Sequence, residues 1–168
     1  MNKMEAGQVE MVDVVDENNR VIGETPRKGV HKTDKLHRAV HIFMLDSDGR
    51  LWIERRGQSV DTHPGFYDSS AADHVSKGES YDEAARREAL EELGIEDLEL
   101  KPCYDLPLGP DTKNEFVRLY ITKSDRKPRL HEGISRFICN HRTFQEQQES
   151  VRCNKCCRRG IYKFYMRL

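Results

Sequence analysis

Residues 78–95 read GESYDEAARREALEELGI, and this stretch decides how the rest of the chain is interpreted. Glu88, Glu91 and Glu92 are spaced i, i+3 and i+4, so on a helix their carboxylates project from one side. Like charges this close repel each other unless a cation lies between them. Oxygen-only ligands favour a hard divalent ion, so the spacing predicts a Mg²⁺ site that also accepts Mn²⁺.

The alternative is a solvated helix with surface ion pairs, which is the usual meaning of a Glu- and Arg-rich helix. Angular positions argue against it. At about 100° per residue from Tyr81, Glu88 and Glu92 fall at roughly −20° and +20°. Ala84 and Ala85 flank them at about −60° and +40°. The carboxylates therefore lie among small apolar residues, and because burying an unpaired carboxylate is costly, a charge partner is expected there.

The stretch resembles the Nudix hydrolase signature, G-x5-E-x7-R-E-U-x-E-E-x-G-U, where U is a bulky aliphatic residue. Aligned on Gly94, the chain supplies the charged positions of the signature with Glu79, Arg87, Glu88, Glu91 and Glu92. Asp73 stands where the family has its opening glycine, whose carbonyl often binds a metal, and Ala89 replaces a larger aliphatic residue.

The resemblance implies hydrolysis of a diphosphate linkage by water attack on phosphorus, with a divalent cation neutralising the phosphates. It implies Glu88, Glu91 and Glu92 as metal ligands, Glu79 as a supporting residue, and Arg87 as the residue that orients the glutamates. We expect the residues that act in catalysis or bind substrate to be Glu91, Glu92, Arg87, the candidate bases Glu115 and Glu132, and Arg55 and Arg56 on the outer phosphate.

The amino-terminal half also resembles type I isopentenyl diphosphate isomerase and the hydrolases most like it. The shared elements include VDENNRVIG, LHRAVHIFMLDSDGRLWIERR and HPGFYDSSAADHVSKGE. In that isomerase three histidines and two glutamates hold a metal, and His31, His37 and His74 fall on the histidine positions. We expect substrate contact or packing for these histidines, with metal binding as the alternative. Ala72 replaces the isomerase cysteine, so the acid–base group is missing.

Composition restricts the possible partners. Lys and Arg number 28 against 29 Asp and Glu, so net charge offers no argument for binding a nucleic acid polymer. No stretch is apolar and long enough to span a bilayer, and the first residues lack a secretory signal. Five cysteines without a regular framework fit reduced thiols, so a cytoplasmic protein is expected, with its oligomeric state undecided.

The remaining pattern predicts strands around one helix. Residues 10–25, and residues 98–106 with 115–122, read as hairpins, and residues 37–45 and 50–55 as strands joined by DSDG. Residues 28–35 and 60–76 read as loops. Ser80 with Glu83 predicts the helix start, and Gly94 its end. We expect an α+β fold, which the resemblance sharpens to the Nudix α/β/α sandwich with a mixed central sheet and a second helix near the C-terminus.

After Arg136 the chain changes character and carries four of the five cysteines. We expect a Nudix domain over residues 1–136 and a divergent tail over 137–168 that packs poorly. Two alternatives are a frameshifted gene end and a metal site built from Cys139, His141, Cys153 and Cys156.

The leading hypothesis is a Mg²⁺-dependent hydrolase acting on a small-molecule diphosphate, such as a nucleoside diphosphate derivative. The alternatives are an isomerase-like protein and a non-catalytic Nudix-like binding module. Ala72 argues against the first. The full set of glutamates in the Nudix signature, hereafter the box (Glu79, Glu88, Glu91 and Glu92), argues against the second.

Overall fold

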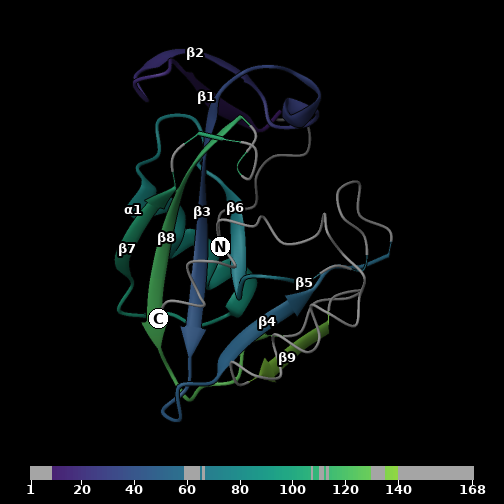
Figure 1. Cartoon of the computed structure of the whole chain (residues 1–168), viewed down its shortest axis with the longest axis vertical. Coiled ribbons are helices and arrows are strands. Elements are labelled where there is room, and N and C mark those ends of the chain that lie inside the picture. The colour runs from purple at the N-terminus through teal and green to yellow at the C-terminus, as the bar shows by residue number, and fades with distance from the viewer. Residues whose placement is uncertain are drawn as a thin grey trace.

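In the described part of the chain, a twisted mixed sheet with the helix α1 (Tyr81–Glu88) against it forms the body of the molecule (Figure 1). The structure is a computed structural model that describes residues 9–58, 65, 67–106, 108–109, 112, 114–129 and 135–139, with the backbone alone for the last range. The elements are, in chain order, β1 (Met11–Val15), β2 (Val21–Pro26), η1 (Val30–Lys32), β3 (His37–Leu45), β4 (Leu51–Arg55), β5 (Tyr67–Asp68), β6 (Ala71–His74), α1 (Tyr81–Glu88), η2 (Ala89–Leu93), β7 (Lys101–Leu106), β8 (Glu115–Lys123) and β9 (Ser135–Cys139).

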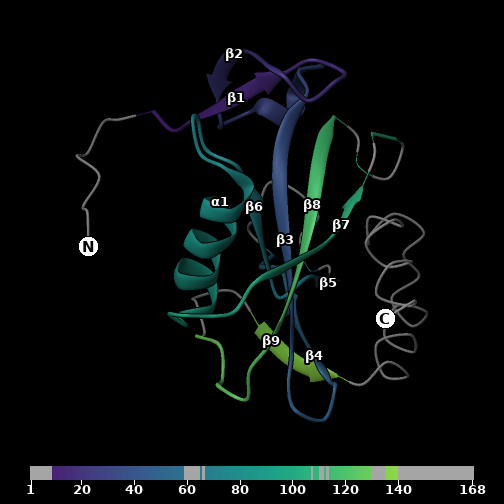
Figure 2. The ribbon, with the colours of Figure 1, turned by 90° about the vertical axis from the view of Figure 1, so that its left-hand side faces the viewer.

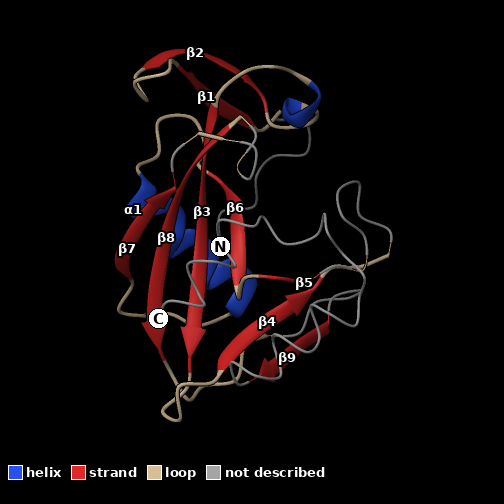
Figure 3. Cartoon of the chain, in the orientation of Figure 1, coloured by secondary structure: helices blue, strands red, loops and turns tan. Residues whose placement is uncertain are grey.

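The central strand of the sheet is β3. The order β5-β4-β3-β8-β7 runs across the sheet, while β6 pairs with β3 and β9 pairs with β4. The β3–β8 pair is parallel and the other pairs are antiparallel, so the sheet is mixed, as expected. The β1–β2 hairpin forms a separate two-stranded sheet at one end of β3, at the top of Figure 3.

Alternating side chains of β3 pack on opposite faces of the sheet. Ala39 and Phe43 face a core shared with β4, β7 and β8. Val40 and Ile42 face the other core, which includes Ala71 of β6 and the helix. Figure 2 shows α1 lying against this second face only. A buried strand with two apolar faces explains the nearly continuous apolar run of residues 39–45.

The helix begins and ends where the sequence predicts. The Ser80 side chain accepts a hydrogen bond from the Glu83 amide, and the Glu83 carboxylate accepts one from the Ser80 amide, which completes a capping box. Gly94 ends the helical segment at φ 67°, a conformation that glycine adopts without strain. The buried Ala84, Ala85 and Ala89 let the helix approach the sheet closely.

Two segments differ from expectation. Residues 60–76 were expected to form an irregular loop, but they contain β5 and β6. The sequence AADH has little intrinsic strand preference, and its pairing with β3 imposes the extended conformation. Within the expected loop at residues 28–35, η1 forms one 3₁₀ turn.

Strand β9 crosses the boundary that was expected after Arg136. Its backbone pairs with β4, from Ser135 opposite Arg55 to Cys139 opposite Leu51. The remainder of the tail, including His141, Cys153 and Cys156, lies outside the described residues, as does the region expected to hold a second helix. The domain boundary therefore stays a prediction.

The capping box gives a direct test of the helix start. Ser80→Ala removes two side-chain hydrogen bonds from the exposed first turn, one accepted from the Glu83 amide and one donated to the Glu83 carboxylate, so we expect the free energy of unfolding to fall by about 1 kcal/mol. Urea denaturation measures it. Ser47→Ala is the matched control, because the Ser47 side chain makes no hydrogen bond within the described part of the chain. Equal stability of both variants would contradict the capping role.

Candidate active site

The box glutamates differ in their exposure. Glu88 ends α1 and is buried, 2% exposed, which confirms the angular argument for this residue. Glu92 is half-buried, and the Glu91 side chain is 61% exposed. Both lie in η2, a π-helical turn, and such turns occur frequently at functional sites. Each residue of a π turn rotates less about the helix axis than a residue of an α-helix. Glu91 and Glu92 therefore depart from the angular positions that were expected for an α-helix.

Arg87 holds the glutamates together from the same helix. It forms a two-pronged pair with Glu79, from Nε to Oε1 at 2.9 Å and from Nη2 to Oε2 at 3.0 Å. Its Nη1 contacts Glu88 and lies 3.3 Å from Oε2 of Glu91. Its Nη2 also donates to the backbone carbonyl of His74, at 3.1 Å. One guanidinium therefore orients three carboxylates and ties the helix to β6.

Burial makes the charge of Glu88 unfavourable. Desolvation raises the pKa of Glu88 to about 8, and the nearby Asp73 carboxylate adds to the effect, while Arg87 opposes it. The carboxylates of Glu91 and Glu92 also raise the pKa of Glu88. The single positive charge of Arg87 does not fully compensate the negative charge gathered here.

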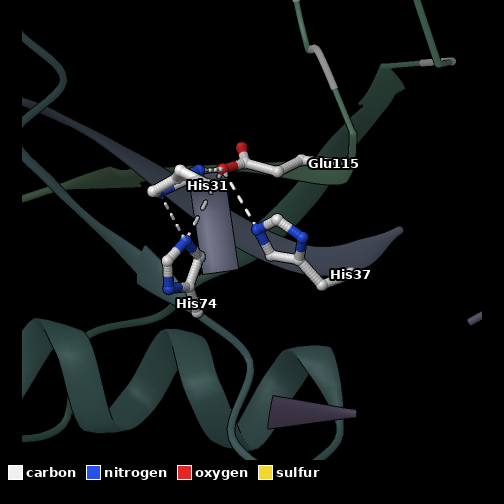
Figure 4. Close-up of side chains that lie close together, drawn as sticks. All are labelled: His31, His37, His74 and Glu115. Carbon is white, nitrogen blue, oxygen red and sulfur yellow. Dashed lines mark hydrogen bonds and ion pairs between the residues drawn. The ribbon is translucent and has the colours of Figure 1, made fainter. Parts of the chain in front are cut away.

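A second polar group lies on the other face of the sheet. His31, His37 and His74 surround Glu115, with ring nitrogens 3.5, 3.4 and 3.5 Å from its Oε1 (Figure 4). The four ligand atoms lie within 4.8 Å of one another. Glu115 and His37 are fully buried, whereas the His31 side chain is 36% exposed. This histidine group therefore has one solvent-facing side.

In the histidine group two hydrogen-bond acceptors face each other, Nε2 of His37 and Oε1 of Glu115. Nδ1 of His37 lies 3.1 Å from the Lys35 carbonyl, which can only accept a hydrogen bond, so Nδ1 carries a proton. In the neutral ring Nε2 then presents a lone pair to the Glu115 carboxylate. This Nε2 is buried without a hydrogen-bond partner among the described residues. A proton or a metal ion between the two atoms would resolve the repulsion, and a backbone carbonyl on the other ring nitrogen is typical of metal-bound histidine.

The sheet register explains why these residues meet. His37 begins β3, Glu115 begins β8, and the parallel pairing sets them opposite each other. His74 pairs with Ala39 from β6, and His31 comes from η1. The signal present in the sequence was that a His and a Glu each open an apolar strand. The connection could not be made without knowing that the two strands pair in parallel.

The remaining predicted residues lie elsewhere. Arg55 donates to the Gly65 carbonyl at 3.2 Å, and Arg56 pairs with Asp68 at 3.3 Å. Arg55 is the last residue of β4, and Arg56 follows it directly. Glu132 lies outside the described residues. Sequence reasoning treated Asp73 only as a departure from the signature and did not single out Arg27, yet the structure pairs these two residues beside Glu88.

Comparisons with known proteins show the family to which the chain belongs. The NUDIX domain model matches residues 35–146, more than half of the chain. An uncharacterized Nudix hydrolase of Pseudomonas aeruginosa is 36% identical over 151 residues, 88% of this chain and 89% of that protein. An uncharacterized Nudix hydrolase of Yersinia pestis is 46% identical over 90 residues, 54% of this chain, and the match spans 50% of that relative's length.

The fold comparison gives the same result. A crystal structure of a Deinococcus radiodurans protein superposes with a TM-score of 0.77 at 27% identity, covering 94% of this chain and 98% of that one. The chain belongs to the Nudix family and has its α+β sandwich fold. In the described part of the chain, no helix has the length and apolar character needed to cross a membrane.

The raised pKa of Glu88 predicts a pH dependence of stability. The unfolded carboxyl titrates near 4.5 and the folded one near 8, so unfolding in this window releases a proton. The contribution of Glu88 to the free energy of unfolding therefore falls with rising pH, by up to about 1.4 kcal/mol per pH unit. In chelator, Glu88→Gln should gain stability relative to the unmodified protein from about pH 5 to about pH 8.

Urea unfolding at several pH values measures this difference, and the exposed Glu17→Gln controls for the change in net charge. A stability difference between Glu88→Gln and the unmodified protein that stays constant across the window would contradict the assignment.

Proposed function

We propose that this chain is a divalent-cation-dependent Nudix hydrolase that cleaves a diphosphate linkage in a nucleoside diphosphate derivative or a similar small molecule. The observation that carries the proposal is the buried carboxylate of Glu88, oriented by Arg87 at a box position of the family's signature. Nudix membership supports a small-molecule phosphate substrate. A carboxylate with an unfavourable buried charge is a group that a cation stabilises.

The donors at the box fit a hard ion. Glu88, Glu91 and Glu92 offer oxygens only, which is the donor set that Mg²⁺ and Mn²⁺ prefer. When bound, such an ion supplies charge neutralisation for the phosphates and a lowered pKa for a coordinated water. Arg87 keeps the glutamates in position through its contacts with Glu79, Glu88 and Glu91.

The proton of the attacking water needs an acceptor that water can reach. Glu91 is the most exposed box glutamate, and we assign this task to it. Glu115, the base favoured by the sequence, has only 1% of its side chain exposed and faces three imidazoles. We therefore give Glu115 a ligand role in the histidine group.

The histidine group supports a second metal centre. Three imidazole nitrogens and one carboxylate oxygen form a mixed donor set, which suits a first-row transition ion such as Zn²⁺ or Mn²⁺ better than Mg²⁺. The buried, unpartnered Nε2 of His37 supports this over simple packing. His74 belongs to this centre through its ring and to the box through its carbonyl, so a substrate at this edge of the sheet would lie near both.

The isomerase alternative lacks a proton-transfer group. Ala72 lies on β6 opposite His41 and next to His74. Alanine neither donates nor accepts a proton, so a metal centre resembling that of the isomerase would here serve hydrolysis. We expect no isomerisation of isopentenyl diphosphate.

The catalytic proposal is tested by Glu92→Gln. The change keeps the side-chain shape and removes the charge that binds the cation, so we expect kcat to fall by at least roughly 10- to 100-fold, the range seen even for outer partners of metal ligands. The assay is hydrolysis of nucleotide diphosphates, nucleotide sugars, dinucleoside polyphosphates and prenyl diphosphates with Mg²⁺. Chelator should abolish turnover.

The exposed Glu96→Gln, beyond the helix end, is the matched control and should retain full activity. Undiminished turnover by Glu92→Gln would rule out its ligand role. Absence of hydrolysis across the whole panel would favour the binding-module alternative.

The second centre is tested by metal content. Untagged protein dialysed against excess Mg²⁺ should retain about one equivalent of a transition metal, measured by mass spectrometry. His31→Gln removes an exposed ligand and should weaken retention by roughly 10-fold or more. Lys32→Gln on the same turn is the control. Equal metal content in the two variants, or none in the unmodified protein, would contradict a metal role for the histidines.

A further inference from the structure

Asp73 lies on the helix-facing side of β6. It pairs with Val40 of β3, and Ala71, two residues earlier, belongs to the core beneath the helix. Because side chains alternate along a strand, the Asp73 side chain leaves the strand on this face, although its Oδ1 also lies 4.0 Å from Nδ1 of His74. The influence of Asp73 on the pKa of Glu88 agrees with this placement. Asp73 is therefore the carboxylate from the sheet that faces the glutamates of the box.

Arg27 contacts this carboxylate. It follows directly after β2, and its Nη2 forms an ion pair with Asp73, while Nη1 lies 3.4 Å from Oε2 of Glu10. Its Nε is buried without a hydrogen-bond partner among the described residues. Glu88 is also close enough to raise the pKa of Arg27. Two arginines thus flank two carboxylates, Arg27 on Asp73 and Arg87 on Glu88.

The Nudix signature suggests a role for the Asp73 carboxylate. The position of Asp73 is the one at which the family has a glycine that offers a carbonyl oxygen to the metal. This chain offers a carboxylate oxygen from the same residue, and carboxylates are preferred ligands of Mg²⁺ and Mn²⁺. We propose that Asp73 is a further ligand of the box cation, an inference that rests on the proposed function. Arg27 is then a positioning residue that pairs with the Asp73 carboxylate until the cation binds.

A cation can replace Arg27 at the Asp73 carboxylate at low cost. The Arg27 side chain is 41% exposed, so it can leave Asp73 by rotating about its own bonds into water. An ion pair that is open to solvent is weak, whereas a divalent ion binds the carboxylate oxygen directly and carries twice the charge. Arg27 and the cation therefore compete for one oxygen, and removal of Arg27 should favour the cation.

The competition predicts opposite effects of two substitutions. Mn²⁺ binding is followed by the loss of the free-ion signal in electron paramagnetic resonance, with every variant carrying His31→Gln because the histidine group also suits Mn²⁺. Asp73→Asn should weaken this binding by roughly 10-fold or more. Arg27→Gln should strengthen it, and in the Asp73→Asn background Arg27→Gln should have no further effect. Lys28→Gln, which removes a neighbouring exposed charge, should change nothing.

Structural damage would weaken binding in both variants, so the opposite signs distinguish competition from misfolding. Weaker binding in Arg27→Gln, or unchanged binding in Asp73→Asn, would overturn the proposal. Hydrolysis that depends on Glu92 while Mn²⁺ binding ignores Asp73 would overturn this inference and leave the proposed function standing. If the unmodified protein binds no ion at the box, both fail together.

Discussion

The register of β3 is the constraint on which the rest of the structure depends. This strand pairs with β4, β6 and β8, and its alternate side chains build the two cores. Its parallel pairing with β8 brings His37 to Glu115, and its pairing with β6 sets Asp73 and His74 on opposite faces. A shift of one residue would exchange the faces and dismantle both polar groups.

Packing of the helix against the sheet sets the charge environment of Glu88. The pKa of Glu88 is raised because the helix buries this side chain against β6, where Asp73 adds a second negative charge. Arg87 offsets part of this cost and at the same time fixes the His74 carbonyl. The packing that stabilises the helix is therefore also the packing that concentrates negative charge. Active sites commonly combine burial and like charges in this way.

Local signals in the sequence predicted much of the fold. Ser80 and Gly94 bound the helical segment as expected, and Gly49, at φ 75°, lies in the turn between β3 and β4. These features depend on neighbouring residues, which is why single-sequence reasoning reaches them. The strand character of β6 was missed because it comes from pairing with β3 rather than from its own residues.

The candidate site was harder to predict from the sequence, because it also depends on which strands pair. The box glutamates are close in the chain, so their grouping follows from helical spacing, although the π turn changes their exposure. Arg27 and Asp73 are 46 residues apart and meet only through the placement of β2 and β6. The histidine group likewise draws on η1, β3, β6 and β8. Contacts of this kind require the strand order, which no local pattern contains.

The alternation of β6 has a consequence for how metals would be sorted. Adjacent residues of one strand direct a carboxylate, Asp73, to one face and an imidazole, His74, to the other. Transition ions outcompete Mg²⁺ at most sites, so a protein that uses both cannot rely on affinity alone. Here two neighbours on β6 contribute different donors, an oxygen toward the signature glutamates and a nitrogen toward the histidine group, to which Glu115 adds one oxygen. The pleat of the sheet would then bias which metal binds on each side of β6.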